Sequence, residues 1–221
     1  LLAGFTVVIG GGIYFWSTYL VDPAWCESRQ FIYSIDLLAL GQTPYRDFMF
    51  NYGPATIYLP FWLSNLTGGA LSFEKAYAIW MVLFTAAGFT IIFAILRKLT
   101  IPAPARPWLL LLALGFWIST SMGLQYTPLR FMVVAGALLF LDSVASRQVS
   151  SGIGALLRIT LAAAAGVAAC LGVSPEMGIA ATVAVGAYSF VLILRREIPY
   201  AAAAIAGALL TGALTLFIFP G

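Results

Sequence analysis

Long apolar runs recur from one end of this 221-residue chain to the other, and no other feature limits its fold as strongly. Hydrophobic residues make up 62% of the sequence, which is more than a soluble domain of this size can bury. In a bilayer a chain must satisfy its own backbone hydrogen bonds, so only helices and closed barrels cross it. The length of the runs favours helices. The sequence therefore predicts an all-α polytopic membrane protein.

Windows of roughly 20 apolar residues predict about seven transmembrane helices, in one core that covers residues 1–221. The expected spans are Leu1–Val21, Tyr77–Leu96, Trp108–Gln125, Leu129–Val144, Ile153–Leu171, Met177–Leu194 and Tyr200–Phe219. The first run lacks the basic start and the cleavage site of a signal peptide, so it is expected to be a span. The chain begins without Met and stops directly after an apolar run, so we expect it to be an excerpt of a longer protein.

Basic residues indicate which loops face the cytoplasm, because loops rich in Lys and Arg stay inside. Three alternate loops hold most of the eleven basic residues, namely Arg97, Lys98, Arg106, Arg147, Arg158, Arg195 and Arg196. The other loops are then outside, and the longest of them is the segment 22–74. Most of the eight carboxylates fall on this outer side, namely Asp22, Glu27, Asp36, Asp47, Glu74 and Glu176. A loop of that length is uncommon without a function.

The types of ionisable residue narrow the chemistry further. The chain has no His, which excludes an imidazole base or a His-ligated metal within it. Its two cysteines, Cys26 and Cys170, form no CxxC pair, so no zinc site is expected. Both cysteines fall on the outer side, which leaves a disulfide open. The net charge of +3 comes from basic residues at helix ends, which is a signal of topology. We therefore expect no nucleic-acid partner.

The outer segment 22–74 predicts two helices that lie near the membrane surface. Apolar residues at helical spacing after Asp22 predict an amphipathic helix that ends at Gly41. A shorter apolar piece, Ala55–Leu66, follows Pro54 and is too short to span comfortably. We interpret it as an interfacial or re-entrant helix.

Between these two helices lies the stretch PYRDFMFNYGP, which is aromatic, rich in proline and charged at its centre. Only 9% of the chain is charged, yet Arg46 and Asp47 are neighbours here. The prolines predict a constrained loop that holds Asp47 where the membrane surface meets the outer ends of the spans. Arg46 can bind a phosphate as well as a carboxylate. The alternative is that the two charges only lock a local turn.

The order of these parts resembles the membrane-embedded glycosyltransferases of the GT-C class, in particular bacterial relatives of the protein O-mannosyltransferase and lipid A aminoarabinose transferase group. The stretches that carry the resemblance are the acidic start DPAWCE of the outer loop, its return segment PYRDFMFNYGPATIYLP, and GVSPEMGI at the outer start of the sixth span. The Asp-Glu doublet that is common in the mannosyltransferase branch is absent.

The resemblance implies an inverting enzyme in a bacterial inner membrane, with its active site facing the periplasm. It would move a sugar from a polyprenyl-phosphate donor to a hydroxyl of a glycan, lipid or protein acceptor. A carboxylate of the outer loop, partly desolvated, would act as general base, with Glu27 the first candidate and Asp47 and Asp22 the next. A second carboxylate would orient the acceptor or bind a divalent cation.

The resemblance also implies roles for arginines and aromatic residues. The donor phosphate would attract an arginine, with Arg46, Arg29 and Arg130 as candidates. The remaining candidates for contact with the substrate are Trp25, Tyr45, Tyr52 and Glu176. The aromatic residues equally fit the aromatic belt of a membrane interface, and Glu176 fits a carboxylate that stabilises a helix start. Arg130 opens the fourth span from the outside, so we expect that it can meet Glu176 across the bundle.

Two other functions remain open at this point. A multi-span transporter would show paired repeats and helices broken near the middle of the membrane, whereas the polar residues here gather outside. A non-catalytic membrane scaffold would not need the acidic outer loop, but nothing forbids a scaffold from having such a loop.

Overall fold

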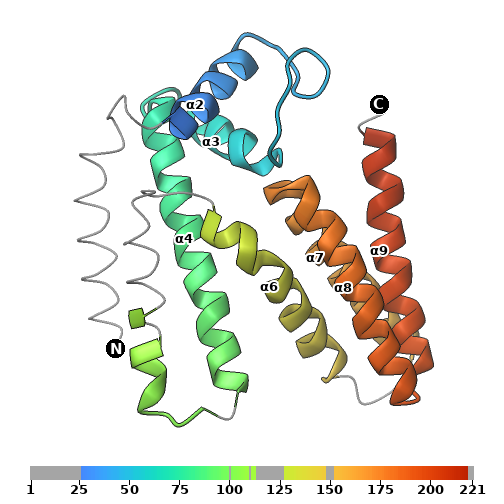
Figure 1. The fold of residues 1–221 in the computed structure, drawn as a ribbon. Helices are drawn as coiled ribbons and strands as arrows, with labels where there is room; N and C mark the ends of the chain where they lie inside the picture. Colours follow the sequence, from blue (N-terminus) through green and yellow to red (C-terminus); the bar gives the residue numbers. More distant parts are fainter. Residues whose placement is uncertain (1–25, 100, 110, 113–126, 148–151, 219–221) are drawn as a thin grey trace. The chain divides into compact units, whose positions relative to one another are not determined.

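The structure is a computed structural model that describes residues 26–99, 101–109, 111–112, 127–147 and 152–218 (Figure 1). Its named elements within these ranges are all helices: α2 (Cys26–Ala39), α3 (Ala55–Leu66), α4 (Phe73–Lys98), α6 (Thr127–Ala145), α7 (Ile153–Val173), α8 (Pro175–Leu194) and α9 (Ile198–Ile218). The predicted all-α class is therefore confirmed for this part of the chain. The chain forms two compact units: unit 1 comprises Leu1–Phe50 and Ala55–Leu129, and unit 2 comprises Asn51–Pro54 and Arg130–Gly221.

Within the described residues, four helices are long and apolar enough to cross a membrane, namely Phe73–Lys98, Ile153–Val173, Pro175–Leu194 and Ile198–Thr215. A shorter apolar stretch, Met132–Ala145, lies in α6. These helices support an integral membrane protein. The expected first span, Leu1–Val21, and most of Trp108–Gln125 lie outside the described residues, so a total of seven spans stays a prediction. Arg158, which we assigned to an inner loop, lies inside α7.

In unit 1, α2 and α3 lie at the N-terminal end of α4 (Figure 1). The helical spacing of apolar residues in α2 places Phe31, Ile35 and Leu38 on one buried face. The helix ends as expected at Gly41, which has a φ of 81°. The Gly41 N–H donates to the Leu38 carbonyl at 2.9 Å, in the hydrogen-bond pattern of a glycine helix stop.

The short apolar piece after Pro54 forms α3, with the same bounds as expected from the sequence. It also ends in a glycine stop, because Gly68 adopts a φ of 62° and the Gly69 N–H donates to the Ser64 carbonyl at 3.0 Å. Ser72 then caps α4 by accepting the Lys75 N–H. The glycine stop ends α3 and the Ser72 cap begins α4 a few residues later. The location of α3 at a membrane interface remains a prediction.

In unit 2, α7, α8 and α9 pack against one another (Figure 1). Two threonine hydroxyls join α7 to α9: Thr160 donates to the Ala203 carbonyl at 3.1 Å, and Thr211 donates to the Ala164 carbonyl at 3.0 Å. The contact that lies further along α7 also lies further along α9, so the two helices run parallel. A Cβ on Gly207 would lie 2.2 Å from the Thr160 carbonyl oxygen, which shows how closely the helices approach.

Helices α6 and α8 also run parallel, and two polar contacts fix their register. Arg130 pairs with Glu176 near the helix starts, and the Tyr188 hydroxyl donates to Asp142 at 3.1 Å nearer the helix ends. Each contact joins residues that are 46 positions apart. Parallel α6 and α8 are what the alternating topology predicts for helices separated by one span.

The turn between α8 and α9 contains a residue in an unusual backbone conformation. Arg196 has a φ of 62°, in the left-handed region where glycine is preferred. Its N–H donates to the Ile193 carbonyl at 2.9 Å, and the Glu197 N–H donates to the Leu192 carbonyl at 2.8 Å. This is the same helix stop as at Gly41, with arginine in the position of the glycine.

Candidate functional site

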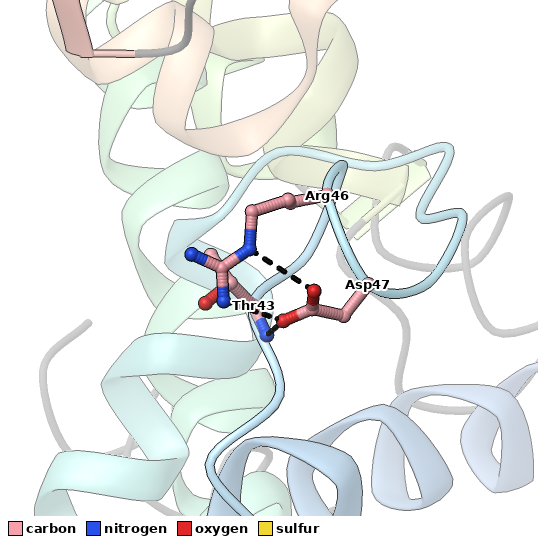
Figure 2. A network of polar contacts seen from close by, with 3 residues as sticks. All are labelled: Thr43, Arg46 and Asp47. Atoms are coloured by element: carbon pink, nitrogen blue, oxygen red, sulfur yellow. Dashed lines mark hydrogen bonds and ion pairs between the residues drawn. The ribbon is translucent and has the colours of Figure 1, made fainter.

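The Arg46–Asp47 pair closes a small ring in the loop that follows α2 in unit 1, as Figure 2 shows. Asp47 Oδ2 accepts hydrogen bonds from the Thr43 N–H and from Arg46 Nη2, both at 2.8 Å. Its Oδ1 accepts from Arg46 Nε at 3.0 Å, so the guanidinium binds the carboxylate through two nitrogens. In return, the Thr43 carbonyl accepts the Asp47 N–H at 2.8 Å. The sequence neighbours thus form the local turn lock that was left open as the alternative.

This ring changes what Asp47 can do chemically. The hydrogen bond from Arg46, followed by that from the Thr43 backbone, lowers the pKa of Asp47 to about 2. A general base works best when its pKa lies near the operating pH, so such an acidic carboxylate is a poor proton acceptor at neutral pH. The geometry therefore favours a positioning role for Asp47 over the role of general base.

The loop is also held by aromatic side chains gathered around Phe50, which is only 3% exposed. Its ring lies 5.9 Å from the ring of Phe31 in α2, 6.3 Å from that of Tyr45 and 6.5 Å from that of Phe48, between centroids. Phe31 in turn stacks on Tyr77 of α4 at 5.6 Å. This aromatic cluster connects the loop to both helices within unit 1.

Tyr45, a candidate for substrate contact, takes part in this packing. Its φ of 67° is rare for a residue with a side chain, and its N–H donates to the Phe48 carbonyl at 2.9 Å. Burial, and secondarily the neighbouring Tyr58, raises the pKa of Tyr45 to about 12, so the phenol stays neutral at physiological pH. A role in contact with a sugar remains a prediction.

In unit 2, Arg130 and Glu176 form an ion pair, which confirms that the two residues meet across the bundle. The Arg130 side chain is 26% exposed and that of Glu176 is 67% exposed, so the arginine is the more buried partner. Glu176 lies in the first turn of α8, directly after Pro175, where a negative charge is favourable. Arg130 lies in the first turn of α6, where a positive charge is unfavourable without a partner such as Glu176.

A backbone contact in unit 2 joins the two stretches that carried the resemblance. The Gly53 N–H, from NYGP, donates to the carbonyl of Val173, from GVSPEMGI, at 3.1 Å. The segment Asn51–Pro54, which includes the candidate Tyr52, thus belongs to the same unit as Glu176 and Arg130. The sequence did not predict this contact. The glycines at 53 and 172 are the signal that could have suggested it, because glycine permits two backbones to approach closely.

A carboxylate that the sequence reasoning did not select is Asp36 of α2. Partial burial, and secondarily the Glu74 carboxylate at the start of α4, raises the pKa of Asp36. Arg29 lies in the same helix, but the structure describes no ion pair between it and Asp36. A carboxylate with a raised pKa is a better proton acceptor at neutral pH than Asp47, so Asp36 joins the candidates.

Several other candidates are placed only in part. Asp22 and Trp25 lie outside the described residues, and Glu27 lies in the first turn of α2 with its side chain not described. Arg29 is exposed on α2.

Cys170 is buried in α7 and carries a free thiol, so the disulfide left open by the sequence is wrong. Within the described ranges, no group of three or more cysteine or acidic residues is arranged to hold a metal ion.

Comparisons with protein-family models, with curated proteins and with solved structures gave no significant match.

Proposed function

We propose that this protein is a membrane-embedded glycosyltransferase that uses a polyprenyl-phosphate sugar as donor. The observation that carries the proposal is the Gly53–Val173 contact, because it joins the two stretches on which the resemblance to the GT-C class rests. Unit 2 also holds the Arg130–Glu176 pair, which supplies a half-buried guanidinium of the kind that suits a lipid phosphate.

The reaction requires one proton transfer and one exchange of bonds. The acceptor oxygen forms a bond to the anomeric carbon of the sugar as the bond from that carbon to the phosphate oxygen breaks. The polyprenyl phosphate leaves with the electron pair, and the acceptor proton passes to a carboxylate. Glu27 is the first choice for this base, with Asp36 as the second, because burial raises the pKa of Asp36. Asp47 instead holds Arg46 in place.

A transfer assay with the full chain in lipid vesicles tests this proposal. We expect Glu27→Gln to abolish transfer of a radiolabelled sugar from its polyprenyl phosphate, and Arg130→Gln to raise the KM for the donor. Glu197→Gln is the matched control, since this carboxylate lies in the turn between α8 and α9. Wild-type vesicles that move free solute but form no glycosylated product would favour a transporter and contradict the proposal.

A further inference from the structure

Gly53 lies against the backbone of the last turn of α7 more closely than any other residue type allows. A Cβ built on Gly53 would lie 2.2 Å from the Gly172 carbonyl oxygen and 2.4 Å from the Val173 carbonyl carbon. Both are main-chain atoms, which cannot move aside as the end of a flexible side chain can. Position 53 therefore requires glycine for reasons of space.

This requirement differs from that of the glycines in the neighbouring turns. Gly41, Gly68 and Gly69 all have a positive φ, and a Cβ on any of them would meet nothing within 4 Å. Those glycines serve the backbone conformation of a turn. Gly53 has no positive φ, and its lack of a side chain serves a contact between distant parts of the chain.

The turn that Gly53 contacts is itself held on both sides. Val173 is the last residue of α7, and the N–H of the buried Ser174 donates to the Cys170 carbonyl at 2.9 Å. Helix α8 begins at Pro175, and Glu176 in its first turn pairs with Arg130 of α6. A backbone hydrogen bond to this turn is therefore made to a fixed support.

We propose that Gly53 is a positioning residue that anchors Asn51–Pro54, the return segment of the outer loop, on the last turn of α7. The anchor fixes Tyr52 in the unit that holds Glu176 and Arg130, which are candidates for contact with the donor. Its effect on sugar transfer rests on the proposed function, whereas the anchoring itself does not.

Hydrogen exchange of the wild-type full chain in lipid nanodiscs gives the first test. The Gly53 amide lies outside any helix, so it should exchange rapidly unless its bond to Val173 persists. We expect its exchange to be at least about tenfold slower than that of the amide of Met49, a residue that is 86% exposed, since a persistent hydrogen bond limits exchange. Equal exchange at the two positions would overturn the proposal without any need for a variant.

Substitution gives the second test, with Gly53→Ala compared to Gly154→Ala. A Cβ on Gly154 of α7 meets nothing within 4 Å, so that variant controls for the added methyl group. In a chain that carries Cys26→Ser and Tyr52→Cys, we expect Gly53→Ala to increase the rate of labelling by a membrane-impermeant maleimide at least about tenfold, because the anchor is lost. Gly154→Ala should leave the rate unchanged. An unchanged rate in folded Gly53→Ala would overturn the proposal.

The transfer assay separates this inference from the proposed function. With Tyr52 retained, Gly53→Ala should lower kcat/KM on the order of 100-fold, the effect of displacing a group near a reaction centre by about 1 Å. If exchange and labelling show the anchor but the wild type transfers no sugar, the proposed function fails and the anchor stands. If the wild type transfers sugar but the Gly53 amide is unprotected, the anchor fails and the function stands.

Discussion

The carboxylate of Asp47 accepts three hydrogen bonds, two from Arg46 and one from the Thr43 backbone. All three favour its charged form, which is why its pKa is low although the residue is exposed. The pair therefore controls the shape of its own loop. Arg46 can offer a phosphate only those guanidinium N–H groups that do not already donate to Asp47.

The pH dependence of this ring follows from the lowered pKa of Asp47. Its stabilising contribution is fully present above the unfolded value of about 3.9 and is lost as the pH falls toward the folded value of about 2. We expect proteolysis within residues 43–48 by an acid-active protease to be slow at pH 5 and faster toward pH 2. Asp47→Asn should make cleavage fast at both pH values, whereas Asp36→Asn should not. Slow cleavage of Asp47→Asn would contradict the ring.

At the scale of elements, the aromatic cluster joins α2, α4 and the loop that follows α2. Phe50→Ala should lower the free energy of unfolding of unit 1 by about 3–5 kcal/mol, because it removes a buried ring and leaves a cavity. Phe48 is less buried, so Phe48→Ala should cost clearly less. Thermal unfolding in detergent micelles, followed by circular dichroism, measures the difference. Equal losses in the two variants would show that Phe50 is not the centre of the cluster.

The close approach of α7 and α9 gives a second prediction at this scale. Gly207→Ala places a methyl group against the Thr160 carbonyl, so the helices must separate at a cost of about 1–3 kcal/mol. Gly212→Ala is the control in the same helix, since a Cβ there meets nothing within 4 Å. Unfolding curves of the two variants in the same detergent compare them directly. A stabilised Gly207→Ala would contradict the packing.

For the whole molecule, the sequence predicted features that depend on local patterns. Apolar spacing and glycine stops are local, so α3 has the expected bounds and α2 ends at Gly41 as expected. The meeting of Arg130 and Glu176 followed from counting alternate spans. The Gly53–Val173 bond joins distant parts of the chain, and no periodicity encodes it. Seven spans and the catalytic roles stay predictions.

The topology itself is a prediction for the whole molecule. Cys26 should react with an impermeant maleimide added outside sealed cells, because it lies near the start of the segment 22–74, which is expected outside. In a Cys26→Ser background, a cysteine introduced by Glu197→Cys in the turn between α8 and α9 should react only after the membrane is opened, because this turn is expected inside. Labelling on the opposite sides would reverse the orientation.

The left-handed backbone conformation of Arg196 costs conformational free energy that a glycine at this position would avoid. Glycine would relieve a strain of roughly 1 kcal/mol at this helix stop, so Arg196→Gly should raise the melting temperature. The same change removes a positive charge from a turn that the positive-inside rule predicts to be cytoplasmic. The Arg196→Gly variant should therefore be more heat-resistant, and a larger fraction of its molecules should be inserted in the opposite orientation. The two results together would make Arg196 a compromise between the stability of the folded protein and the orientation of its spans during insertion.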